Sequence, residues 1–446
     1  MPMRARSPYR LRSHILALAA ALLLCPSLAR AQQAPSLSRA ERQLRDAVRR
    51  AQPDAIGYLG RVVDIPSGTM NFAGVRRVGG VFRASLDSLG FATRWVPGEP
   101  FGRAGHLVAE HKGRAGRKRV LLIGHLDTVF EGENQRWTLE DSIGHGAGSA
   151  DMKGGDVAIL YALRAMQAAG TLKDANVIVV MTGDEENAGE PLEAARRDLV
   201  DAAKRSDAAL AFEGGSRGQV VTGRRSSSSW RLEVGGRQAH SSGVFSEGVG
   251  YGAIYEAARI LDEFRRELGG ERGLTFNPGV IVGGERVSFD TTMLSGTAAG
   301  KTNIVAPRVV VVGDLRAVTP GQRDSARTRM QAIVARNLGR TTATITFDEG
   351  YPPMAPTAGN ERLRALYDSA SQALGYGPVE GNDPTRRGAG DASFVAPYVD
   401  VIDGLGVDGA GSHSPNESVN LPSLLMQTER AAMVITRLTR ERAPKR

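Results

Sequence analysis

Carboxylate and imidazole side chains follow several apolar segments in this 446-residue chain. Asp184, Glu185 and Glu186 form one acidic run two residues after the apolar segment 175–181. Adjacent carboxylates repel one another, and a buried carboxylate is costly unless a positive charge compensates it. The other polar residues in comparable places are His125, Asp127, Asp151, Glu213 and His413. Such groups together can bind a hard or borderline divalent cation, such as zinc, and can transfer protons.

Each of these positions also has a simpler structural interpretation. A strand-end triplet such as His125–Asp127 can be purely structural, and an aspartate in a Gly-rich loop, such as Asp151, often forms a turn or caps a helix. Paired glutamates commonly lie on a solvated surface, and an isolated histidine such as His413 can do the same. A metal site is therefore predicted only if the fold gathers these residues at one place.

Cysteine cannot contribute to such a site once the N-terminus is processed. The only cysteine, Cys25, lies in a segment where arginines precede the apolar run 15–24 and small residues end at Ala31. This pattern is typical of a secretory signal peptide, so we expect residues 1–31 to be removed and the protein to be secreted or periplasmic. Without thiolates, metal ligands must come from histidine, aspartate and glutamate.

The net charge gives little support to a polyanion-binding function. The whole chain carries +9, but loss of residues 1–31 removes five arginines and no acidic residue, which leaves +4. A weakly basic balance of this kind does not indicate a nucleic-acid partner. The apolar run 15–24 is too short for a membrane span, so no membrane association is expected after processing.

Short apolar segments alternate with amphipathic ones in the region that carries most of the polar residues. Segments 119–124, 175–181 and 208–214 are predicted as buried strands, and segments 156–170 and 190–200 as helices. Such alternation is typical of an α/β fold, with a mostly parallel sheet covered by helices on both faces. Ligands in these folds bind beyond the carboxyl ends of the strands, which is where the polar residues follow.

A different pattern begins near residue 225 and ends near residue 350. Segments 308–316 and 342–347 read as strands, and helices are expected over about 247–268 and 320–337. This combination indicates a smaller α+β unit with antiparallel strands. We therefore predict one α/β domain in two parts, interrupted by an inserted domain; the boundaries are 32–225, 226–350 and 351–446.

Five motifs occur in order along the chain: HLDTV at 125–129, ADMKGG at 150–155, GDEEN at 183–187, FEGG at 212–215 and SHSPNE at 412–417. In this order and at these separations they resemble the M20 family of di-zinc metallopeptidases, especially its glutamate carboxypeptidase and acylamino-acid hydrolase branches. The resemblance spans nearly the whole processed chain. It implies a zinc-exopeptidase-like catalytic domain carrying an inserted dimerisation or lid domain.

The resemblance also implies roles for individual residues. Asp151 would bridge two zinc ions, for which Co2+ or Mn2+ could substitute. The remaining ligands would be His125 and Glu213 for one ion, and Glu186 and His413 for the other. Glu185 would be the general base, and Asp127 would orient His125 by accepting its second ring N–H. Asp184 receives no role.

The inserted domain contributes further expectations. His240 lies in a motif, GGRQAHSSG, whose histidine in dimeric relatives reaches the partner's active site and stabilises the oxyanion, which implies a homodimer through the inserted domain. Asn303 and Arg316 resemble residues that face the substrate. The simpler alternatives are a surface histidine and, for Arg316, an ion pair within the inserted domain.

One position departs from the family pattern. Glutamate carboxypeptidases of the family hold the substrate α-carboxylate with an arginine just before a proline, whereas this chain has Tyr351 before Pro352. C-terminal glutamate specificity is therefore not implied. The alternative carboxylate-binding residues are Arg224, Arg225, Arg386 and Arg387, each of which can also be ordinary loop charge.

The resulting expectation is an exported di-zinc amidohydrolase acting on small peptides or N-acyl amino acids. The main rival is a non-catalytic binding protein that retains this fold. Metal content and turnover separate the two functions.

Overall fold

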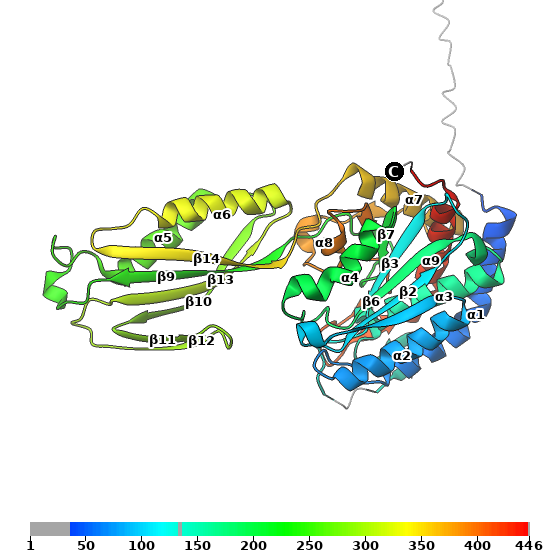
Figure 1. The fold of residues 1–446 in the computed structure, drawn as a ribbon, viewed down its shortest axis with the longest axis horizontal. Helices are drawn as coiled ribbons and strands as arrows, with labels where there is room; N and C mark the ends of the chain where they lie inside the picture. Colours follow the sequence, from blue (N-terminus) through cyan, green and yellow to red (C-terminus); the bar gives the residue numbers. More distant parts are fainter. Residues whose placement is uncertain (1–35, 133–135, 445–446) are drawn as a thin grey trace, which may run out of the picture.

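The computed structural model describes residues 36–132 and 136–444, so the predicted signal peptide, residues 1–31, lies outside the described part. Figure 1 shows an α/β domain from which an elongated domain extends to one side. No helix within the described ranges is both long and apolar enough to cross a membrane.

A six-stranded sheet forms the centre of the α/β domain. Its strand order is β1-β2-β6-β3-β7-β16. The strands span Ala92–Pro97 (β1), Gly105–His111 (β2), Arg119–His125 (β3), Asn176–Thr182 (β6), Ala208–Ala211 (β7) and Val401–Ile402 (β16). The last four are parallel, whereas β1 and β2 add an antiparallel edge, so the sheet is mixed.

Helices cover both faces of this sheet (Figure 1). They are α1 (Arg39–Val63), α2 (Phe72–Ser88), α3 (Gly154–Ala168), α4 (Leu192–Lys204), α7 (Ala358–Leu374), α8 (Ala392–Val395) and α9 (Leu421–Arg440). Alternate residues of β3 face opposite sides, as strand geometry requires. Val120 and Leu122 pack with α1, α3 and α9, whereas Leu121 and Ile123 pack with α4 and α8. The strands are thus buried on both faces, which explains their continuous apolar sequences.

Residues 36–50 have the sequence pattern of an amphipathic helix, and α1 continues beyond them to Val63. It continues through Pro53, although a proline inside a helix removes one hydrogen bond and costs about 3 kcal/mol. The residues beyond it include Leu59 and Val62, which are fully buried in the main core. Burial of this apolar face offsets the loss at the proline.

The inserted domain has a separate core. Its four-stranded antiparallel sheet has the order β10-β13-β9-β14, and helices α5 and α6 pack on it. These elements span Ser227–Gly236 (β9), Gly252–Leu268 (α5), Thr275–Gly284 (β10), Arg308–Arg316 (β13), Pro320–Val334 (α6) and Thr341–Tyr351 (β14), with a hairpin at Arg286–Asp290 (β11) and Ser295–Ala299 (β12). Trp230 is fully buried at its centre, against Phe264.

The chain enters and leaves the inserted domain through two adjacent segments. The backbone N–H of Arg224 donates to the carbonyl oxygen of Met354 at 2.9 Å, and the N–H of Met354 donates to the carbonyl oxygen of Arg224 at 3.1 Å. Beyond them, Ser227 in β9 pairs with Tyr351 in β14. We call the paired segments 224–227 and 351–354 the stalk.

Several short elements complete the α/β domain. One small sheet contains β4 (Thr138–Glu140), β5 (Ile143–His145), β17 (Gly409–Ala410) and β18 (Ser418–Asn420), and another pairs β8 (Gln219–Val220) with β15 (Glu380–Gly381). Short helical turns span Glu99–Phe101, Ser149–Lys153, Leu172–Asp174 and Pro384–Arg386, and a further turn, Ser241–Gly243, lies in the inserted domain. The first of the small sheets pairs β5 with β18, which brings the loop before Asp151 close to the loop after His413.

Candidate dinuclear metal centre

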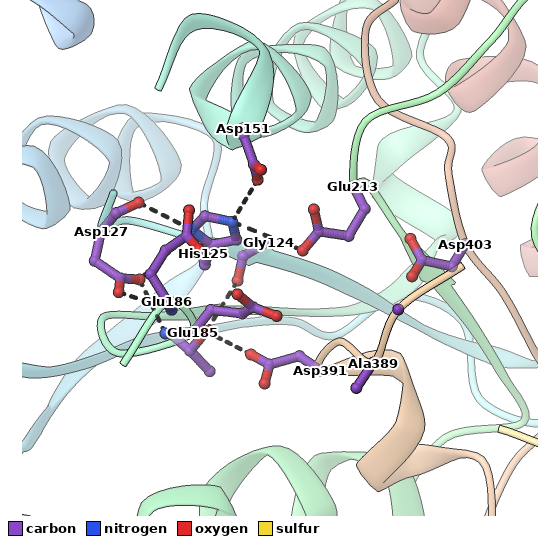
Figure 2. Close-up of polar contacts among 12 residues, drawn as sticks. Gly124, His125, Asp127, Asp151, Glu185, Glu186, Glu213, Ala389, Asp391 and Asp403 are labelled. Carbon is purple, nitrogen blue, oxygen red and sulfur yellow. Dashed lines mark hydrogen bonds and ion pairs between the residues drawn. The ribbon is translucent and has the colours of Figure 1, made fainter. Parts of the chain in front are cut away.

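Three parallel strands bring the predicted ligands to one edge of the sheet. His125 is the last residue of β3 and pairs with Thr182, the last residue of β6. On its other side, β3 pairs with β7, which ends two residues before Glu213. The carboxyl ends of adjacent parallel strands meet, so residues distant in sequence converge there. Figure 2 shows His125, Asp151, Glu186 and Glu213 around one centre.

The first group of donor atoms surrounds His125, whose side chain is buried. Its Nε2 atom lies 3.2 Å from Oδ1 of Asp151 and 3.7 Å from Oε1 of Glu213. Asp151 comes from the loop before α3, between β3 and β6 in sequence. The structure therefore brings together the three residues expected to hold one ion.

The second group forms on the other side of Asp151. Nε2 of His413 lies 3.4 Å from Oδ2 of Asp151 and 3.2 Å from Oε2 of Glu186. His413 is mainly exposed, and its φ of 62° places it in the left-handed region, which non-glycine residues seldom adopt. The two oxygens of Asp151 thus face two different histidines, the arrangement that a bridging carboxylate requires.

These distances and charges fit a pair of metal ions. Donor atoms held about 2.1 Å from a tetrahedral zinc ion lie about 3.4 Å from one another. Burial raises the pKa of Glu186 to about 7 and that of Glu213 to about 8, so the nearby positive groups offset only part of the cost of burying these acids. Oε1 of Glu186 is also buried without a hydrogen-bond partner. The donor set contains imidazole and carboxylate groups alone, which suits zinc and similar divalent ions.

Glu185 lies beside the cluster. One of its carboxylate oxygens lies within 4.8 Å of a donor atom of His125 and of a donor atom of Glu213. Burial, followed by the negative charge of Glu213, raises its pKa well above the usual glutamate value. A carboxylate with high proton affinity next to a metal centre is suited to accept a proton.

Asp127 organises the residues around it from a fully buried position. Its carboxylate accepts the backbone N–H groups of Glu185 at 3.0 Å and Glu186 at 3.1 Å, and the hydroxyl of Thr69 at 2.7 Å. Nδ1 of His125 lies 3.0 Å from the backbone oxygen of Asp127 and 3.5 Å from Oδ1. The backbone oxygen is thus nearer to the imidazole than the carboxylate that was expected to orient it.

Two buried residues support the site but have no role in the sequence-based interpretation. Glu417 accepts the N–H groups of Gly148, Ala150 and Asp151 at 2.8–2.9 Å, and so holds the loop that carries Asp151. Lys153 donates to the carbonyl oxygen of Ile65 at 2.9 Å, and burial lowers its pKa to about 7. Both lie inside recognised motifs, SHSPNE and ADMKGG. That position is the one sequence signal that could have identified them.

The predicted residues of the inserted domain do not contact the cluster within one chain. His240 is exposed and its Nδ1 lies 2.8 Å from the hydroxyl of Ser242. Asn303 is also exposed, and its carbonyl oxygen accepts the N–H of Ser241. Arg316 forms an ion pair with Asp314 at 2.8 Å, which is the structural alternative foreseen for it.

Comparison with known proteins agrees with this architecture. The curated relatives include carboxypeptidase G2 of Pseudomonas sp. (strain RS-16), 26% identical over 398 residues, covering 86% of this chain and 89% of the relative. Another is succinyl-diaminopimelate desuccinylase of Alkalilimnicola ehrlichii, 29% identical over 320 residues, covering 68% of this chain and 79% of the relative.

Solved structures share the fold. Aminopeptidase PepT from Bacillus cereus superposes with a TM-score of 0.71 at 18% identity, covering 87% of this chain and 98% of that one. The YXEP protein of Bacillus subtilis, described as a dinuclear metal-binding peptidase of the M20 family, gives a TM-score of 0.61 at 14% identity, covering 88% and 99%. Residues 121–438 match the peptidase family M20/M25/M40. That region is more than half of the chain and contains every predicted metal ligand, so this protein belongs to the M20 family of metallohydrolases.

Proposed function

We propose that this M20 metallohydrolase uses two zinc ions, with Glu185 as general base, to hydrolyse an amide bond in small peptides or N-acyl amino acids. The observation that carries the proposal is the placement of Asp151 between His125 and His413, at 3.2 and 3.4 Å. The names of two relatives, a carboxypeptidase and a desuccinylase, are consistent with amide hydrolysis.

The residues divide into two ligand sets that share Asp151. His125 and Glu213 complete one set, and Glu186 and His413 complete the other. Bound ions would polarise the amide carbonyl and lower the pKa of a bound water. The buried carboxylates with raised pKa values would be ionised when they bind metal.

Glu185 moves the proton. It accepts one proton from the attacking water and delivers it to the departing nitrogen, which converts a poor leaving group into an amine. Its backbone N–H is held by Asp127 at 3.0 Å, beside the N–H of Glu186. Asp127 thus fixes the turn that carries both residues, so the carboxylate of Glu186 can point to the metals and that of Glu185 to the reacting atoms.

A homodimer would place His240 beside this centre. Large apolar side chains are exposed on the inserted domain, among them Phe245, Tyr251, Ile254 and Tyr255 on and before α5 and Ile281 on the edge strand β10. Grouped apolar side chains on a surface favour a protein interface. We infer that two copies associate through this domain and that His240 of one copy stabilises the oxyanion in the other.

Arg387 is the arginine best placed to bind a carboxylate of the substrate. Arg224 is already paired with Asp403 at 2.6 Å. Arg387 donates to the carbonyl oxygen of Gly214, next to the ligand Glu213, at 2.7 Å, and its Nε is buried without a partner. Among the described residues it forms no ion pair within 4 Å. An unpaired guanidinium beside the metal centre favours substrates with a free carboxylate.

Turnover of defined amides tests this function. Processed protein starting at Gln32 would be loaded with zinc and assayed against dipeptides and N-acetyl amino acids, each as the free acid and as the C-terminal amide. Hydrolysis of a subset, abolished in Glu185→Gln, is the expected result. Tight binding of these compounds without hydrolysis would instead indicate the non-catalytic binding protein.

Export is a separate part of the proposal. The predicted signal peptide motivates it, and the N-terminal residue of protein recovered from a secreting host tests it. A mature N-terminus at Gln32 is expected, whereas retention of residues 1–31 on a cytoplasmic protein would contradict export.

A further inference from the structure

Arg196 is the centre of a buried polar network behind the metal centre. This residue lies on α4, and its side chain is 1% exposed. Its Nη1 donates to Oδ1 of Asp184 at 2.7 Å, and its Nε donates to Oδ1 of Asp391 at 2.8 Å. Asp184, the acidic residue without a role in the sequence, is thus one carboxylate partner of a buried guanidinium.

The same guanidinium reaches the backbone of Glu185 through a tyrosine. Nη2 of Arg196 donates to the hydroxyl oxygen of Tyr351 at 2.9 Å, and that hydroxyl donates to the carbonyl oxygen of Glu185 at 2.8 Å. On the other side of Glu185, its N–H donates to Asp127 at 3.0 Å. The backbone of Glu185 is therefore fixed at both its donor and its acceptor.

Asp391 connects this network to the strand that precedes Glu185. Its Oδ2 accepts the hydroxyl of Thr182 at 2.6 Å, and Thr182 is the last residue of β6. Figure 2 shows Asp391 beside Glu185, on the side away from Asp151. The strand end and the acidic turn are thus held by one set of hydrogen bonds.

Tyr351 also belongs to the stalk of the inserted domain, because it is the last residue of β14. Its ring packs on Phe394 of the α/β domain, with ring centres 4.8 Å apart. The hydrogen bond from Tyr351 therefore joins the stalk directly to the turn that carries Glu185.

We propose that Arg196 and Tyr351 are positioning residues that set the direction of the Glu185 carboxylate and link it to the stalk. The inference rests on the proposed role of Glu185 as base. Proton transfer requires hydrogen-bond distances, and a displacement of about 1 Å can lower a rate by about 100-fold. A shift of the Glu185 backbone would move its carboxylate by a comparable amount. The ligands on other segments would keep their positions, and Asp127 would still hold the N–H of Glu186 at 3.1 Å.

Tyr351→Phe is the direct test, because it removes the hydroxyl and keeps the ring on Phe394. Tyr58→Phe is the matched control: Tyr58 is buried, and its hydroxyl likewise donates to a backbone carbonyl, that of Val81, away from the site. With the fastest-cleaved amide of the panel, we expect kcat to fall about tenfold in Tyr351→Phe, with KM and zinc content unchanged. Hydrogen exchange should become faster at residues 183–187. The control should change none of these quantities.

A second variant tests the guanidinium. Arg196→Lys keeps the charge. Arg196 donates to Asp391, Asp184 and Tyr351 from three different nitrogens, however, and the single nitrogen of lysine cannot reach all three acceptors. Its effect on kcat should be non-additive with that of Tyr351→Phe, as expected for one network. Additive effects would overturn the link between the two residues. If the lysine variant does not fold, Tyr351→Phe alone decides.

The outcomes separate the inference from the proposed function. If the wild type is active and Tyr351→Phe has the same kcat and the same hydrogen exchange as the wild type, the inference is overturned and the proposed function stands. Absence of wild-type turnover would overturn the function, and the exchange data would then decide whether Tyr351 holds the turn. Equal loss of kcat in Tyr58→Phe would show a general packing effect and would also overturn the inference.

Discussion

Nε2 of His413 lies 3.2 Å from Oε2 of Glu186, although the entire inserted domain separates the two residues in sequence. The second ligand set is therefore completed only when both parts of the α/β domain have folded together. We expect His413→Ala to lower bound zinc from about two ions per chain to about one, because the first set keeps Asp151, His125 and Glu213. Elemental analysis after gel filtration measures this. His111→Ala, outside the cluster, should retain both ions, and two tightly bound ions in His413→Ala would contradict the ligand assignment.

Glu185→Gln separates proton transfer from metal binding. Glutamine has nearly the same shape but cannot accept the proton, so turnover should fall by at least about 100-fold while zinc content stays near two. Steady-state kinetics and elemental analysis give the two numbers. The exposed Glu193→Gln is the matched control and should behave as wild type. Substantial activity in Glu185→Gln would exclude it as the base.

The raised pKa values of Glu186 and Glu213, about 7 and about 8, predict a pH dependence of stability in the metal-free protein. A glutamate in the unfolded chain has a pKa of about 4.3. These two groups then bind more protons in the folded metal-free protein than in the unfolded chain. Their contribution to stability is fully present below that value and is lost as pH rises through about 7 to about 8. Scanning calorimetry of the metal-free protein should show a lower midpoint temperature of unfolding at pH 8.5 than at pH 6.

Zinc should reverse that trend, because the ions bind the ionised carboxylates. At free zinc near 100 times its dissociation constant, binding adds about 2.7 kcal/mol to the free energy of unfolding. Parallel scans with zinc and with chelator make the comparison. Identical pH dependence under both conditions would argue that these acids do not bind the metal.

Mixed dimers test whether His240 acts across an interface. Glu185→Gln and His240→Ala chains should each be inactive alone and should regain partial activity when subunits exchange, because one of the two sites then has both groups. Differential tags and native mass spectrometry would verify the heterodimer. Verified heterodimers without activity would contradict a histidine supplied in trans.

Arg387→Met tests recognition of a substrate carboxylate. We expect KM for free-acid substrates to rise about tenfold or more, with little change for the matching C-terminal amides. Arg386→Met, at the exposed neighbouring position, provides the comparison. An equal rise for acids and amides would show that Arg387 acts on the site in some other way.

The sequence predicts the centre of the fold well because its strands are buried on both faces. Continuous apolar runs identified β3, β6 and β7, and the polar residues after them identified the site edge. Strands β1 and β2 were not foreseen. Strand β1 is the edge strand, and β2 lies between it and β6. The antiparallel pairing of β2 with β6 depends on contacts between segments that are distant in sequence.

Supporting residues were harder to infer than ligands. Glu417 acts on backbone N–H groups more than 260 residues away, and no local pattern specifies that acceptor. The family pattern marks position 351 only as the place of an expected arginine, yet the hydroxyl of Tyr351 contacts both Arg196 and the Glu185 carbonyl. Such roles depend on three-dimensional proximity between segments that share no periodicity.

The paired backbone hydrogen bonds of Arg224 and Met354 reduce the entropic cost of inserting a whole domain into the α/β domain. Those residues are about 130 positions apart, but the folded inserted domain delivers its two ends side by side. Closing a flexible loop of that length, rather than one of about four residues, would cost about 3 kcal/mol more in chain entropy. A self-folding insert removes most of that difference. For the α/β domain, the entropic cost of the inserted domain is therefore close to that of a short turn. Replacing residues 225–353 with a few glycines should leave both ligand sets intact.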